Sequence, residues 1–138
     1  MRLPTKDEIN VYNSLDELTA CEHFLDKTLE EVEVLFRESS LGYGQDLVWM
    51  GPKAFAFYLQ AVINYLRSDF SAGDNDVVNC LCSVIEYRLQ DKEFLLARDS
   101  VNTIVGYVTD NYEKFEVDTN IYGDLLGKYR QLHNRLKD

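Results

Sequence analysis

Two neighbouring stretches of the chain are apolar except for a narrow polar stripe. In the stretch 54–66 only two positions are polar, and with the charged residues on either side they fall on one arc of a helix. This arc consists of Lys53, Gln60, Asn64 and Arg67. The stretch 75–90 has the same design, with a polar stripe of Asp76, Asn79, Ser83, Glu86 and Gln90. Helices this apolar must be covered on most sides, and the short turn at 71–74 predicts that they form a buried helical hairpin over about 52–90.

Capping boxes predict three further helices in the first third of the chain. In a capping box the hydroxyl of the first residue accepts the N3 amide, and the glutamate three positions on reaches back to the cap amide. The boxes are Thr5-x-x-Glu8, Ser14-x-x-Glu17 and Thr28-x-x-Glu31, and the predicted helices cover about 6–12, 15–25 and 29–38. The third helix has an apolar stripe of Leu25, Leu29, Val32 and Phe36.

Two amphipathic helices are predicted at the end of the chain. Their apolar faces are Val101, Ile104, Val105, Val108, Tyr112 and Phe115, then Tyr122, Leu125, Leu126, Tyr129, Leu132 and Leu136. Between the third helix and the hairpin, the glycines in 41–46 predict a loop, and 47–50 is predicted as a short extended segment before Pro52 opens the next helix. The sequence therefore predicts one all-α domain, 1–138, of about six helices around the hairpin. The predicted core positions are Phe55, Tyr58, Leu59, Val62, Leu66, Leu81 and Ile85.

Charge narrows the classes of partner. The chain carries 14 basic and 24 acidic side chains, a net charge of −10, which disfavours nucleic acid because phosphate would be repelled. The first 50 residues hold 11 acidic and 4 basic side chains. Within them Glu30, Glu31 and Glu33 form either a solvated helix face or an acidic patch for a basic partner.

Motifs for metal, cofactor or catalytic chemistry are weak. Cys21, His23, Cys80 and Cys82 are soft metal ligands, but Cys80 and Cys82 point away from each other on a helix. The stretch 118–129 resembles a calcium loop at positions 1, 3 and 6, yet Tyr129 stands where a bidentate glutamate is needed, and helix capping explains the same residues. Neither histidine belongs to a nucleophile motif. We therefore predict no catalytic residues, no cofactor and no metal.

The segment 43–52 is the most unusual candidate surface. It holds Tyr43, Asp46 and the only tryptophan, Trp49, between two predicted helices. Aromatic side chains in loops often anchor protein interfaces. The alternative is that Trp49 and Met50 plug the end of the bundle.

Cysteine usage and the N-terminus favour a cytoplasmic protein. Three cysteines cannot all pair within one chain, so free thiols in a reducing compartment are the simpler interpretation. The first residues have neither the apolar core of a signal peptide nor a transit pattern, and no run of 18 apolar residues predicts a membrane span.

One segment resembles a known group of proteins. The residues from Trp49 to Leu59, W-M-G-P-K-A-F-A-F-Y-L, look like a segment that recurs in small uncharacterised bacterial proteins. The region from Ser14 to Phe36 is also similar to theirs, so the resemblance covers about the first half of the chain. It implies a bacterial cytosolic protein and carries over no activity, cofactor or site residue.

The sequence thus favours a non-enzymatic module that binds another protein. One alternative is an acidic inhibitor of a toxin or nuclease, of the immunity type. Another is a small-molecule binder or enzyme with a pocket near Trp49. A homodimer is predicted if an apolar face of the hairpin stays uncovered, with Glu30, Glu31 and Glu33 facing Arg130 and Lys137 within or between chains.

Overall fold

The computed structural model describes residues 2–137, which form eight α-helices, three 3-10 turns and no strand. The helices are α1 (Lys6–Ile9), α2 (Leu15–Phe24), α3 (Leu29–Trp49), α4 (Pro52–Arg67), α5 (Asn75–Arg88), α6 (Arg98–Asp110), α7 (Thr119–Tyr122) and α8 (Leu125–Leu136). The 3-10 turns are η1 (Asp69–Ser71), η2 (Phe94–Leu96) and η3 (Tyr112–Phe115). The predicted all-α class is confirmed. Among residues 2–137, no helix has both the length and the hydrophobicity that a transmembrane span requires.

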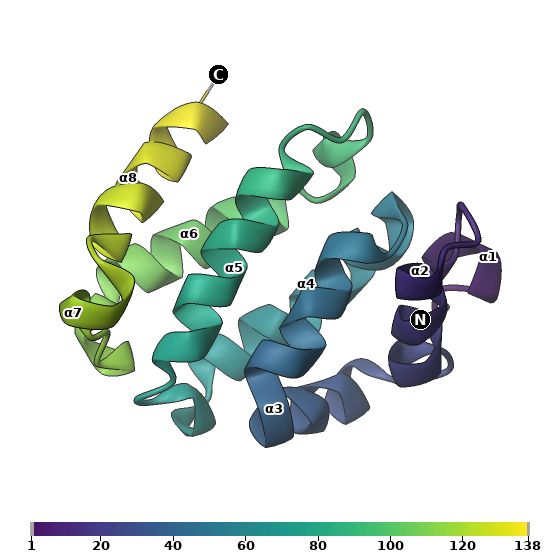
Figure 1. Ribbon diagram of the computed structural model, residues 1–138, viewed down its shortest axis with the longest axis horizontal. Coiled ribbons are helices and arrows are strands. Elements are labelled where there is room, and N and C mark those ends of the chain that lie inside the picture. The colour runs from purple at the N-terminus through teal and green to yellow at the C-terminus, as the bar shows by residue number, and fades with distance from the viewer. Residues whose placement is uncertain (1, 138) are drawn as a thin grey trace.

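The helices run from α1 and α2 at one end of the molecule to α7 and α8 at the other (Figure 1). Helix α3 packs against α2, α4 and α5, while α6 packs against α4 and α8. The predicted hairpin helices, α4 and α5, are both buried as expected. Their main shared partner is α3, so the prediction that they pack mainly on each other as a hairpin is wrong.

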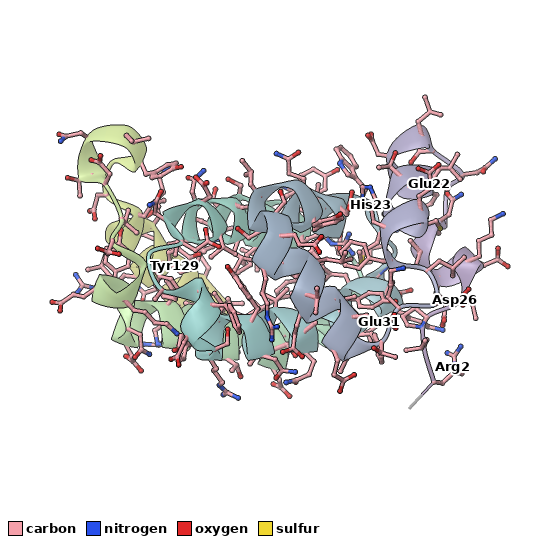
Figure 2. The ribbon with its side chains drawn as sticks, turned by 90° about the horizontal axis from the view of Figure 1, so that it is seen from below. Arg2, Glu22, His23, Asp26, Glu31 and Tyr129 are labelled. Atoms are coloured by element: carbon pink, nitrogen blue, oxygen red, sulfur yellow. The ribbon has the colours of Figure 1, made fainter. Side chains whose placement is uncertain are left out.

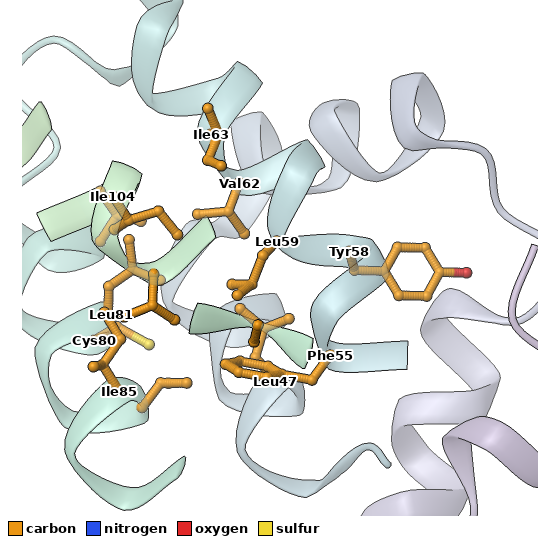
Figure 3. Packing of buried hydrophobic residues seen from close by; sticks show 14 of the residues in the cluster. Leu47, Phe55, Tyr58, Leu59, Val62, Ile63, Cys80, Leu81, Ile85 and Ile104 are labelled. Carbon is orange, nitrogen blue, oxygen red and sulfur yellow. The ribbon is translucent and has the colours of Figure 1, made fainter. Parts of the chain in front are cut away.

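The predicted core positions are confirmed. Each of Phe55, Tyr58, Leu59, Val62, Leu66, Leu81 and Ile85 is at most 1% exposed. Figure 3 shows Phe55, Leu59, Leu81 and Ile85 in the same buried cluster as Leu47 of α3 and Ile104 of α6. The apolar faces of α4 and α5 are covered by α1, α3, α6 and α8 of the same chain. The uncovered apolar face on which the homodimer prediction depended is therefore not present on these two helices.

The loop predicted at 41–46 and the extended segment at 47–50 are wrong, because α3 continues to Trp49. The predicted helix 29–38 ends at a real feature, since Ser39 has non-helical angles (φ −161°, ψ 84°) that kink α3. The Ser39 hydroxyl accepts the backbone N–H of Gly42 at 3.3 Å and so caps the second half. A Cβ on Gly44 would lie 2.8 Å from the Sγ of Cys80, so this glycine allows close packing of α3 on α5 rather than a turn.

The predicted helix starts are confirmed at Thr5, Ser14 and Thr28, whose side chains accept the expected N3 amides. The last helix differs from its prediction. Asp118 caps only the single turn α7, and Asp124 caps α8 by accepting the backbone N–H of Gly127 at 2.9 Å. Part of the stretch that resembles a calcium loop is therefore two successive helix caps.

Candidate functional site

A cleft of about 600 Å³ lies where three segments meet. These segments are the connection from α1 into α2, the junction of α3 with α4, and the C-terminal end of α5 with its following loop. The lining residues are Tyr12, Ser14, Glu17, Val48, Trp49, Met50, Gly51, Pro52, Tyr87, Arg88, Gln90, Asp91, Lys92 and Glu93. A volume of this size lies within the range of ligand-binding pockets.

A glycine joins two of these segments. The backbone N–H of Gly51 donates to the carbonyl of Ile9 at 3.0 Å. A Cβ at Gly51 would overlap the carbonyl oxygen of Glu8 and would lie 2.5 Å from a methyl group of Val11. The chain can approach this closely only because position 51 has no side chain.

Exposed aromatic rings stand at the cleft. Trp49 is 43% exposed and Tyr87 is 51% exposed, and their ring centroids lie 6.0 Å apart at an interplanar angle of 59°. Tyr12, on the connection from α1 into α2, also lines the cleft and is 85% exposed. Large aromatic side chains are usually more buried than this, so their gathering at one hollow is informative.

Arg88 lies in the floor of the cleft and is 4% exposed. Its Nη1 atom donates to the carbonyls of Val48 and Met50 at 3.0 and 2.5 Å, and more weakly to that of Leu47 at 3.4 Å. These are carbonyls at the C-terminal end of α3, where intrahelical partners run out and the helix dipole is negative. The guanidinium also stacks 4.4 Å from the centre of the Phe55 ring.

The Arg88 Nε atom lies 2.6 Å from the Oδ2 of Asp91, although its N–H is not aligned for a hydrogen bond. Burial lowers the pKa of the Arg88 guanidinium, and the Asp91 charge opposes that shift. An arginine stays charged under these conditions, so the floor of the cleft carries a fixed positive group paired with an acid.

Glu17 orders the part of the cleft formed by the connection from α1 into α2. Its carboxylate is 4% exposed and accepts the backbone N–H of Tyr12 at 2.9 Å and the hydroxyl of Ser14 at 3.0 Å. The second capping box therefore departs from the usual pattern, because its glutamate reaches past the cap residue to Tyr12. This contact fixes the backbone that carries the exposed Tyr12 ring.

Of the predicted contact residues, Trp49 lines the cleft, but Tyr43 and Asp46 meet His23 of α2 instead. The Tyr43 and His23 rings pack edge to face at 5.0 Å, and the Oδ2 of Asp46 lies 2.6 Å from the Nδ1 of His23. Asp46 is 6% exposed, so a partner cannot reach it as predicted. Burial raises the pKa of the Asp46 carboxyl, and His23 offsets part of that shift.

The predicted acidic residues lie on the first turns of α3, away from the cleft. Glu31 completes the capping box of Thr28. The hydrogen bond from the Thr28 backbone N–H lowers the pKa of the Glu31 carboxyl. Glu33 accepts the side-chain amide of Asn64 at 3.3 Å, and Glu30 is exposed. Figure 2 shows Glu31 far from Tyr129 of α8. The predicted pairing of these glutamates with Arg130 and Lys137 inside one chain is therefore wrong.

The cysteines are buried free thiols, as predicted. Cys82 contacts the Glu86 carboxylate at 3.2 Å, and Cys80 faces Gly44. Within residues 2–137 no three potential ligands of the His, Cys, Asp or Glu type converge on one point.

Sequence reasoning missed Arg88, Tyr87 and Asp91. A signal for Arg88 was present, since it follows Leu81 and Ile85 by seven and three positions and so lies on the apolar face of α5. A charged residue on a buried stripe requires polar partners, which here are the end of α3 and Asp91.

Comparison of the chain with protein-family models, with curated proteins and with solved structures finds no match.

Proposed function

We propose that this protein is a non-enzymatic module that binds another protein through the cleft. The observation that carries the proposal is the gathering of three exposed aromatic side chains, Tyr12, Trp49 and Tyr87, around one hollow. Tyrosine and tryptophan dominate the energetics of protein interfaces, because they bury a large area and lose little conformational entropy.

The charged groups of the cleft favour binding over catalysis. Arg88 donates to the end of α3 and is paired with Asp91, while Glu17 accepts a backbone N–H and a hydroxyl. Groups engaged in this way hold a surface in shape and are poorly placed to transfer protons. A preformed surface loses little entropy when a partner docks.

A selection from a random-peptide library tests this function. The native protein should enrich a set of peptides, the variant Tyr87→Ala should lose them, and the variant Phe70→Ala should keep them. Phe70 is the matched control because it is 62% exposed and lies outside the cleft. The proposal fails if the native protein enriches nothing, or if both variants bind the same peptides equally.

A small-molecule ligand is a second candidate, and the cleft volume of about 600 Å³ favours it. A screen of uncharged aromatic fragments would separate the two. Fragments that bind more tightly than any selected peptide would favour the small-molecule site.

The acidic inhibitor of the immunity type is a third candidate, and the net charge of the first 50 residues favours it. Its contact surface would include the exposed Glu30 on α3. A target whose binding weakens in Glu30→Gln but not in Tyr87→Ala would place that function on α3 and not in the cleft.

A further inference from the structure

We infer that the segment bound in the cleft is basic, and that it places a lysine or arginine side chain against the rings of Trp49 and Tyr87. This inference rests on the proposed function and names the chemistry of its partner.

The negative charge of the chain, −10 in total, favours a cationic segment. The charged side chains that line the cleft are acidic at Glu17, Asp91 and Glu93 and basic at Arg88 and Lys92. One of the two basic residues, Arg88, is buried and already paired with Asp91. Glu93 is exposed at the cleft. A partner of opposite charge is therefore attracted, whereas a second copy of this chain, with a net charge of −10, is repelled.

The rings of Trp49 and Tyr87 offer a surface on which a cationic side chain can pack. Arg37 lies 4.0 Å from the centre of the Phe70 ring and Arg88 lies 4.4 Å from that of Phe55. Within residues 2–137, no lysine or arginine occupies the ring of Trp49 or Tyr87 in this way. Two exposed rings without a cation, at a cleft that Glu93 also lines, offer a binding site for a cationic side chain, and tryptophan is the ring that attracts cations most strongly.

The only tryptophan of the chain lies in the cleft, so its intrinsic fluorescence reports binding without a label. Three blocked pentapeptides serve as probes: Leu-Arg-Leu-Arg-Leu, its neutral counterpart with glutamine in place of arginine, and its acidic counterpart with glutamate. We expect the arginine peptide to bind at least about fivefold more tightly than the glutamine peptide at low salt. The difference should shrink as salt screens the charges.

Two matched variants locate the effect. Glu93→Gln removes an exposed carboxylate at the cleft, and Glu30→Gln removes one on the first turn of α3. Glu93→Gln should weaken the arginine peptide severalfold and leave the glutamine peptide unchanged, whereas Glu30→Gln should alter neither. Tyr87→Ala should reduce the preference for arginine over glutamine.

Equal binding of the arginine and glutamine peptides, or tighter binding of the glutamate peptide, would overturn the inference and leave the proposed function standing. So would a selection that enriches cleft-dependent peptides without basic residues. Saturation by free arginine amide at the same concentration as the peptide would also overturn it, because the site would then recognise a small cation. If no pentapeptide binds and the library also yields none, the proposed function fails as well.

Discussion

Helices α3 and α4 each end against a basic side chain from a distant part of the chain, as does α8, where Arg98 donates to the carbonyl of Leu136. At the end of α3, Arg88 donates to the carbonyls of Val48 and Met50 at 3.0 and 2.5 Å. At the end of α4, Lys114 donates to the carbonyls of Leu66 and Ser68 at 2.6 and 3.0 Å. Both cations satisfy carbonyls that a helix cannot satisfy itself, and both oppose its negative end.

The two ends differ in burial and in what adjoins them. Arg88 is 4% exposed and forms the floor of a cleft with three exposed aromatic rings. Lys114 is half-buried, and the hollow beside it, of about 480 Å³, contains one aromatic side chain, Tyr112. The same capping chemistry therefore supports a candidate binding surface at the C-terminal end of α3, whereas at the C-terminal end of α4 it only stabilises the helix end.

Removal of the buried guanidinium should have the largest effect. Arg88→Met leaves the end carbonyls of α3 without their donor and Asp91 without its partner. We expect the free energy of unfolding to fall by about 3 kcal/mol. Urea denaturation followed by circular dichroism measures this, with Arg67→Met as the exposed control, expected within about 0.5 kcal/mol of the native protein. A loss below 1 kcal/mol for Arg88→Met would mean that water replaces the guanidinium.

The close approach at Gly51 should be the next most sensitive feature of the α3 end. The methyl group in Gly51→Ala meets the Glu8 backbone and Val11, so the Gly51 to Ile9 hydrogen bond must stretch. We expect a loss of about 2 kcal/mol. Gly106→Ala is the matched control, because a Cβ there meets nothing within 4 Å on α6 and should stabilise by about 0.5–1 kcal/mol. Equal stability of both variants would show that the 8–11 segment moves aside freely.

The α4 end should tolerate the loss of its cation better. In Lys114→Met the carbonyls of Leu66 and Ser68 still accept the Ser71 hydroxyl, at 2.8 and 3.1 Å, so we expect a loss of about 1 kcal/mol in the same denaturation experiment. Lys92→Met, at an exposed lysine of the cleft, is the control and should change the free energy of unfolding by less than about 0.5 kcal/mol. If Lys114→Met lowers the free energy of unfolding more than Arg88→Met does, the burial of the capping cation does not determine how much each helix end contributes to stability.

Most of the fold could be predicted from local patterns. The polar stripes of α4 and α5 and the caps at Thr5, Ser14 and Thr28 depend on residues near in sequence, and they were located correctly. The second half of α3 was missed because Gly44 is typical of a loop, while its actual role depends on Cys80, 36 positions away. Local propensity does not register a contact between distant helices.

The candidate site was predicted only at Trp49. Tyr43 and Asp46 lie three positions apart on α3 and therefore share one face of the helix, which packs against His23 of α2. Tyr87 and Arg88 enter the cleft through the packing of α5 on α3, which no spacing rule in the sequence contains.

Alkaline pH should weaken the α3–α5 contact that places Arg88 beneath α3. Burial, with smaller contributions from Asp74 and Asp76, raises the pKa of the Cys80 thiol from its usual 9.0 to about 11. The unfolded chain therefore loses this proton before the folded protein does. The stabilisation is complete below pH 9 and declines as the pH rises toward 11. Between pH 8 and pH 10 this one thiol should reduce the free energy of unfolding by about 1 kcal/mol.

Urea denaturation of Cys80→Ala across the same pH range isolates this contribution. The variant loses a constant amount of packing energy, but its stability should decline less steeply with pH than that of the native protein. Val84→Ala, which also creates a small cavity on α5 and removes no thiol, should keep the native slope. Parallel slopes for all three proteins would mean that Cys80 ionises as readily in the folded protein as in the unfolded chain. The close contact of Gly44 with Cys80 would then admit water, and the α3 end would depend on Arg88 more than on the packing beside it.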